Sequence, residues 1–178
     1  MNSIYLMGIP AYFSYIIKNH NKIIQTLQMN VDNLYLDSNS IIYDAYNSLK
    51  KDNITNIELL EKTLIENTCK KIESYIKLVQ PKKRVIIAFD GVAPVAKLEQ
   101  QRVRRHRTLF IKQINNVFEK SNDIWSTSLI TPGTPFMNKL NNYCRTYFKK
   151  DNYIYVFGSD EPGEGEHKIF EFIRNNNH

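Results

Sequence analysis

Several features that mark other classes of protein are scarce in this sequence. The 178 residues include six glycines, six prolines and two cysteines. Sparse glycine and proline exclude a collagen-like tract and a flexible linker, and two cysteines form at most one disulfide, which excludes a disulfide scaffold. Because at most one disulfide is possible, we expect a reducing compartment. Cys69 and Cys144 also lie far apart in the sequence and match no zinc-binding spacing.

Signals for membranes and for secretion are also missing. No apolar run approaches the roughly 20 residues that a membrane-spanning helix needs. The N-terminus lacks a basic segment followed by an apolar core and a small-residue cleavage site. We therefore expect an intracellular protein, in the cytoplasm or the nucleus, with no membrane partner.

Common signatures of nucleotide-binding and nucleophilic enzymes are absent as well. Neither a GxGxxG nor a Walker phosphate loop occurs, and Gly163 and Gly165 in the segment PGEGE do not form one. His106 and His167 have no metal-ligand spacing with the cysteines, and we interpret them as surface or network residues rather than catalysts. No Ser/His/Asp arrangement or cysteine nucleophile is supported.

The composition is that of a folded domain. Hydrophobic residues make up 42%, aromatic residues 12% and charged residues 24% of the chain, which excludes a disordered or fibrous protein. A chain of this size buries roughly 70% of its unfolded surface and commonly forms one domain. The net charge of +6 and the pI near 9.2 suit a polyanionic partner, although such a surplus is common among proteins without one.

Short apolar segments alternate with longer segments of helical periodicity. A capping box of Thr55 and Glu58 predicts the start of one long helix, and Pro81 predicts its end. The expected strands cover 33–37, 84–90 and 153–157, and the expected helices cover 11–20, 41–48, 56–79, 97–120, 135–148 and the segment after Gly163 as far as about Arg174. This alternation predicts an α/β fold with a mostly parallel sheet flanked by helices.

Acidic residues follow each expected strand. Asp37 closes the first strand and Asp90 the second, and Asp160, Glu161, Glu164 and Glu166 follow the third. In open α/β sheets a ligand binds outside the carboxyl ends of the strands. Crowded carboxylates repel one another unless cations neutralise them, so the pattern predicts a site for Mg²⁺ or Mn²⁺. Two such ions activate water and stabilise the leaving oxygen in phosphodiester cleavage.

Each acid also has a structural interpretation. An Asp directly after a strand commonly caps the next helix or turns the chain. Glu164 and Glu166 lie near an expected helix start, where the helix dipole favours acids in any case. The metal interpretation depends on three strand ends carrying acids together, rather than on any single residue.

A strongly basic segment follows Asp90. Lys97, Gln101, Arg104 and Arg105 recur at helical spacing and can share one face of the expected helix over 97–120. Such a face can bind a phosphate through charge-assisted hydrogen bonds, although many basic helix faces are only solvated. Because the helix starts seven residues after Asp90, we expect the basic face beside the acids. That arrangement suits a nuclease that binds a terminal phosphate.

The sequence resembles the XRN-type 5′→3′ exoribonucleases over nearly its whole length. The motifs that carry the resemblance are MGIPAYFSYI at 7–16, NLYLDSNSIIYDA at 33–45, AFDGVAPVAKLEQQRVRRHR at 88–107, ITPGTPFM at 130–137 and EPGEGEHKIFEFIR at 161–174. The resemblance implies a PIN/flap-nuclease-like fold and a metal-dependent enzyme. It also implies that the enzyme releases mononucleotides from RNA bearing a 5′-monophosphate.

The resemblance also assigns roles to residues. It implies that Asp37, Asp90, Glu164 and Glu166 hold Mg²⁺, with Mn²⁺ as a substitute, and that Lys97, Gln101, Arg104 and Arg105 form the 5′-phosphate pocket. Tyr43 occupies the position at which the family usually has a His that stacks on a base.

Residues 1–178 match the N-terminal segment of the family's nuclease domain. The family continues into further strands with metal-binding Asp residues, so we expect a sheet that is incomplete at its C-terminal end. A second chain is a candidate source of those elements. Two other functions stay open: a catalytically weak or inactive relative that binds 5′-phosphorylated RNA, and a flap-type nuclease acting on DNA.

Overall fold

The computed structural model describes residues 11–25, 30–49, 55–95, 97–99, 102–103, 106, 110 and 125–176. It divides the chain into two compact units, 1–30 and 31–178, and each is described by itself. In the first unit, α1 (Tyr12–Asn19) follows Ala11, which has a left-handed φ of 58°, and leads into the short 3₁₀ helix η1 (Asn21–Ile23). The helix expected over 11–20 is therefore confirmed, with slightly shorter ends.

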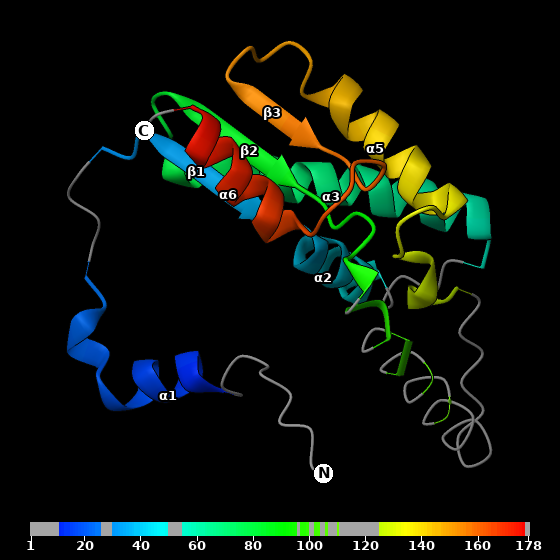
Figure 1. Ribbon diagram of the computed structural model, residues 1–178, viewed down its shortest axis with the longest axis horizontal. Coiled ribbons are helices and arrows are strands. Elements are labelled where there is room, and N and C mark those ends of the chain that lie inside the picture. Colours follow the sequence, from blue (N-terminus) through cyan, green and yellow to red (C-terminus); the bar gives the residue numbers. More distant parts are fainter. Residues whose placement is uncertain are drawn as a thin grey trace. The chain divides into compact units, whose positions relative to one another are not determined.

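The second unit is built on a three-stranded parallel sheet with the order β1-β2-β3 (Figure 1). The strands are β1 (Asn33–Asp37), β2 (Arg84–Ala88) and β3 (Ile154–Phe157). Asp37 pairs in register with Ala88, and Ala88 with Phe157, so all three carboxyl ends lie level at one edge. The predicted α/β class, with a parallel sheet flanked by helices, is confirmed.

Helices cover both faces of this sheet. On one face, α2 (Asn39–Leu49), α3 (Ile57–Val79) and α5 (Pro135–Tyr147) form the hydrophobic core with Val85 and Ile87 of β2 and with Phe89, which directly follows it. On the other face, α6 (Gly165–Asn175) runs across β1 and β2 (Figure 1). A short 3₁₀ helix, η3 (Thr127–Leu129), precedes α5. Among the described residues, no helix has the length and apolarity that crossing a membrane requires.

The ends of two elements differ from the sequence prediction. The capping box of Thr55 and Glu58 is wrong, because Asn56 caps α3 by accepting a 3.0 Å hydrogen bond from the Leu59 N–H. The strand expected over 84–90 ends at Ala88, and Phe89 and Asp90 begin the following loop. Most of the helix expected over 97–120 lies outside the described residues, although 97–99 and 102–103 are helical.

The two cysteines, distant in sequence, meet inside the core. Cys69 on α3 and Cys144 on α5 are fully buried free thiols whose sulfur atoms lie 3.1 Å apart. The hydrogen bond to Cys69, together with burial, raises the pKa of the Cys144 thiol well above its usual value. A buried neutral thiol is a poor nucleophile. We therefore interpret the two cysteines as packing residues between α3 and α5 rather than as reactive groups.

Candidate functional site

Four carboxylates converge at the carboxyl edge of the sheet. Asp37 ends β1, Asp90 follows β2, and Glu164 and Glu166 lie at the start of α6. Partial burial raises the pKa of Asp37, and the negative charges of Asp90, Glu166 and Glu164 raise it further. The acids that sequence spacing selected are thus close enough to repel one another, as expected for residues at the same edge of a parallel sheet.

Asp90 is the most firmly oriented of these acids. Its Oδ2 accepts a 2.9 Å hydrogen bond from Asn39 Nδ2, and its backbone N–H donates to Asn39 Oδ1 at 3.1 Å. Its Oδ1 accepts the Gly165 N–H at 2.8 Å. The first residues of α2 and α6 therefore hold the Asp90 carboxylate from two sides of the sheet.

The approach of α6 to the strand ends depends on glycine. A Cβ atom at Gly165 would lie 2.6 Å from Asp37 Oδ1 and 3.2 Å from the Ala88 carbonyl oxygen. Real Cβ atoms essentially never come closer than 3.0 Å to another atom, so a side chain here would displace the Asp37 carboxylate. Gly165 therefore lets the first turn of α6 sit directly against the acidic residues.

A second contact joins the loops that follow β2 and β3. The Gly91 N–H donates to the Gly163 carbonyl oxygen at 2.8 Å, and the Gly163 N–H donates to the Val92 carbonyl oxygen at 3.1 Å. A Cβ atom at Gly91 would collide with the Glu161 carbonyl oxygen. The close backbone pairing of the two loops brings Glu164 toward Asp90.

Lys97 lies against the acidic cluster, as its position after Asp90 predicts. Its Nζ is 2.6 Å from Glu164 Oε2, and this hydrogen bond raises the pKa of Lys97. The Glu164 side chain is only 8% exposed, whereas the Lys97 side chain is 47% exposed. The ammonium group therefore neutralises one of the four acids while remaining accessible to solvent.

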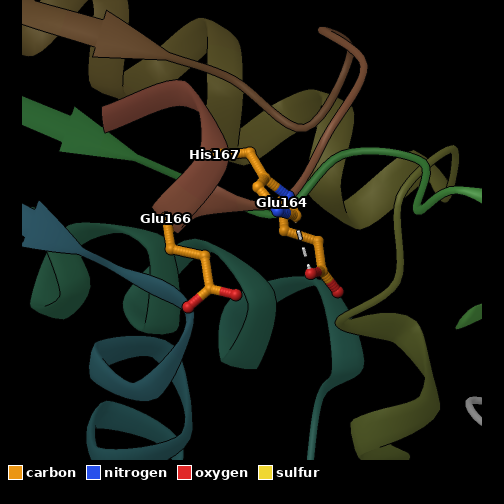
Figure 2. Close-up of side chains that lie close together, drawn as sticks. All are labelled: Glu164, Glu166 and His167. Carbon is orange, nitrogen blue, oxygen red and sulfur yellow. Dashed lines mark ion pairs between the residues drawn. The ribbon is translucent and has the colours of Figure 1, made fainter. Parts of the chain in front are cut away.

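His167 adds a potential ligand that sequence reasoning did not select. Glu164, Glu166 and His167 each present one ligand atom within 4.8 Å of the others, and Figure 2 shows Glu164 and His167 side by side with Glu166 to one side. His167 Nδ1 lies 3.8 Å from Glu164 Oε2, and its side chain is 59% exposed. The spacing of three residues between Glu164 and His167 on α6 is the signal that could have identified it.

Two supporting residues were also missed. Asn39 holds Asp90 as described above, and its position two residues after Asp37 was a weak hint of that role. Lys168 is only 5% exposed, and its Nζ donates 2.7 Å hydrogen bonds to the carbonyl oxygens of Phe89 and Gly158. Burial lowers the pKa of Lys168, and no sequence pattern marked this lysine as buried.

Other residues named from the sequence lie elsewhere. Asp160 and Glu161 pair with Arg145 of α5. Tyr43 is 41% exposed on α2 and lies one helical turn after Asn39, on the same side of the helix. Three of the predicted phosphate-binding residues lie outside the described residues: Gln101, Arg104 and Arg105.

The donor set fits a hard divalent cation. Carboxylate oxygens are the ligands that Mg²⁺ and Mn²⁺ prefer. Partial burial, and after it the negative charges of Asp90, Glu166 and Glu164, raise the pKa of Asp37. Among the described lysines and arginines, only Lys97 forms an ion pair with these acids. A divalent cation would supply the missing positive charge.

Comparison with known proteins gives one consistent result. A family model described as the XRN 5'-3' exonuclease N-terminus matches residues 7–178. The chain is 37% identical to 5'-3' exoribonuclease 1 of Saccharomyces cerevisiae and 31% identical to the human protein of that name, in each case over 94% of this chain. It is 30% identical to 5'-3' exoribonuclease 2 of Kluyveromyces lactis, also over 94% of its length. The chain spans 12%, 11% and 22% of these three relatives.

Proposed function

Because the chain belongs to the XRN 5'-3' exonuclease N-terminus family, we propose that it forms the metal-binding and 5′-end-recognising part of a 5′→3′ exoribonuclease. The substrate is RNA with a 5′-monophosphate, and the products are mononucleotides. Residues 1–178 act as the N-terminal segment of the nuclease domain, in the cytoplasm or the nucleus. The convergence of Asp37, Asp90, Glu164 and Glu166 beside Lys97 is the observation that supports this function.

The four carboxylates are the proposed holders of Mg²⁺, with Mn²⁺ as a substitute. When bound, such a cation lowers the pKa of water and stabilises negative charge on a phosphodiester. Asp90 contributes a carboxylate whose direction is fixed by Asn39 and Gly165. Glu164, almost fully buried, contributes one that is already paired with a cation, the Lys97 ammonium group.

Recognition of the RNA end is assigned to the basic segment and to α2. Lys97, Gln101, Arg104 and Arg105 bind the terminal phosphate through charge-assisted hydrogen bonds. A pocket that accepts one phosphate excludes a cap or a triphosphate, because the additional bulk and charge have no partners there. The exposed ring of Tyr43 stacks on a base near the 5′ end.

One assay tests the proposal directly. Single-stranded RNA carrying a 5′-monophosphate is incubated with the chain in Mg²⁺ or Mn²⁺, in parallel with the same RNA carrying a 5′-hydroxyl. We expect mononucleotides to be released from the phosphorylated RNA alone. The Asp90→Asn variant controls for contaminating nuclease, because the substitution removes one carboxylate and preserves the side-chain volume.

The other outcomes distinguish the alternatives. Metal-dependent binding of the phosphorylated RNA without cleavage would identify a non-cutting relative, or a site that a second chain completes. Equal cleavage of the corresponding DNA would favour a flap-type nuclease instead. Salt titrations of RNA and DNA binding separate general phosphate attraction from recognition of the sugar.

A further inference from the structure

Lys168 has no role in the proposed chemistry, yet its environment is unusual. It is the only lysine or arginine that is buried within the described part of the chain, and lysine is almost never fully buried unless it is paired. Its Nζ is bonded to two backbone carbonyl oxygens, those of Phe89 and Gly158. These carbonyl groups lie just beyond β2 and β3, so one side chain from α6 connects the ends of two neighbouring strands.

The carbonyl group of Phe89 belongs to the same peptide unit as the Asp90 N–H. Lys168 Nζ binds that unit on its carbonyl side at 2.7 Å, and Asn39 Oδ1 accepts the N–H on its other side at 3.1 Å. A peptide unit is planar, so fixing both of its polar groups fixes its orientation. The orientation of this peptide unit sets the direction in which the Asp90 side chain projects from the backbone.

Lys168 and the backbone of its own helix act on the same acid. Gly165, three residues before Lys168 on α6, donates its N–H to Asp90 Oδ1 at 2.8 Å. One turn of α6 therefore holds Asp90 twice, through the preceding peptide unit and through the carboxylate. A shift of this turn would move both contacts together.

We propose that Lys168 is a positioning residue for Asp90 and thereby raises the affinity of the acidic cluster for a divalent cation. The inference rests on the proposed function, because it takes Asp90 to be a metal ligand. Residues that orient metal ligands typically change metal affinity by roughly 10- to 100-fold when they are replaced. A lysine suits this position because its long stem reaches two carbonyl groups from one helix.

The sign of the change in cation affinity on replacing Lys168 distinguishes a positioning role from a purely electrostatic one. Lys168 carries a positive charge near the cluster, so its removal by charge alone would strengthen cation binding. The loss of two hydrogen bonds to the strand ends would instead release the peptide unit before Asp90 and weaken binding. A role confined to stability would leave the cation affinity of the folded protein unchanged.

The test compares Lys168→Met with a matched control, and Mn²⁺ binding is measured by the electron paramagnetic resonance of the free ion. Asn141→Leu is the control, because Asn141 is 1% exposed and its side chain holds both the hydroxyl and the N–H of Ser159 after β3. We expect Lys168→Met to lower Mn²⁺ affinity about tenfold and Asn141→Leu to leave it within about twofold. Both proteins are compared where circular dichroism shows them folded.

A second measurement does not need the metal. Hydrogen exchange of the Gly165 amide in metal-free protein reports its bond to Asp90 Oδ1. We expect Lys168→Met to accelerate that exchange about tenfold relative to Asn141→Leu, since a released Asp90 protects the amide less. Lys168→Gln, which keeps a hydrogen-bond donor group on a shorter side chain, should fall between the wild type and Lys168→Met, and it replaces the methionine variant if that one does not fold.

These outcomes separate the inference from the proposed function. Unchanged or stronger Mn²⁺ binding by Lys168→Met, with unchanged Gly165 exchange, would overturn the positioning role and leave the proposed function standing. A wild-type chain that binds no Mn²⁺ would count against the proposed function. In that case, faster Gly165 exchange in Lys168→Met would still support the positioning of Asp90.

Discussion

Two groups of acids follow the strands of the same sheet, and their charges are balanced in different ways. Asp160 and Glu161, after β3, share the guanidinium of Arg145, which lies 2.8 Å from Asp160 and 2.9 Å from Glu161. The acidic cluster of Asp37, Asp90, Glu164 and Glu166 has an ion pair only between Lys97 and Glu164 among the described lysines and arginines. In the first group one guanidinium serves two acids, whereas in the second one ammonium group serves four, so the second retains more negative charge.

The pKa directions follow from this difference. The hydrogen bond to Arg145 lowers the pKa of Asp160. Partial burial and three neighbouring acids raise the pKa of Asp37. Asp37 ends β1 and Asp160 lies shortly beyond the end of β3, so a position near a strand end does not by itself set the direction of the pKa shift. The distinguishing property is how much opposing charge the described part of the fold supplies to each group of acids.

The largest expected effect comes from removing one carboxylate from each group. Asp90→Asn should weaken Mn²⁺ binding more than about 100-fold, because losing a ligand costs more than losing a residue that orients one. Asp160→Asn should leave Mn²⁺ affinity within about twofold, because its carboxylate pairs with Arg145 rather than with a metal. Calorimetric titration of both folded variants measures the contrast. Similar losses in the two variants would remove the distinction between the groups.

The second largest expected effect comes from adding a methyl group at each of two glycines, one beside each group of acids. A Cβ atom at Gly165 would press on Asp37 Oδ1, and a Cβ atom at Gly158 would collide with Asp160 Oδ1. Gly165→Ala should therefore lower Mn²⁺ affinity about tenfold. Gly158→Ala should lower the free energy of unfolding and reduce Mn²⁺ affinity by less than Gly165→Ala does, because its Cβ atom would meet Asp160, Arg145 and Asn141 rather than an acid of the cluster. Urea unfolding and Mn²⁺ titration of both variants check this, and a Gly165→Ala protein with wild-type affinity would contradict the close packing of Asp37.

Much of this arrangement could be predicted from sequence because it depends on local patterns. The apolar run over 84–90 and the intervening helical periodicities predicted a parallel sheet, and such a sheet places its carboxyl ends together. The convergence of Asp37 and Asp90 follows from that topology. The position of Lys97 beside the acids follows from the short distance in sequence between Asp90 and the basic segment.

The remaining features depend on contacts between distant segments. Arg145 lies on α5, and no local pattern indicated that it would neutralise Asp160 rather than face solvent. The burial of Lys168 depends on the position of α6 over the ends of β2 and β3. Asn56 replaced Thr55 as the cap of α3 because both residues are capable caps, and the choice depends on where the helix packs.

The smallest expected effect is a difference in the pH dependence of stability, measured without divalent cations. Asp37 has a folded pKa above its usual 3.8, so the folded state binds more protons than the unfolded state above pH 3.8. The free energy of unfolding then falls as pH rises through the folded pKa. Asp160 has a folded pKa below 3.8, so its stabilisation is complete above pH 3.8 and is lost as pH falls through the folded pKa.

Opposite substitution effects follow for the two acids. At pH 7, Asp37→Asn should raise the free energy of unfolding and Asp160→Asn should lower it, each by up to about 1 kcal/mol because both side chains are partly solvent-screened. The benefit of Asp37→Asn should disappear below pH 3.8, where Asp37 is protonated in both states. Urea unfolding with a chelator present measures both variants across pH. Mn²⁺ at a concentration that saturates the wild type should then stabilise the wild type more than Asp37→Asn, because only the wild type retains the full set of proposed ligands. Changes of the same sign in the two variants would mean that the acidic cluster is neutralised internally, as Asp160 is.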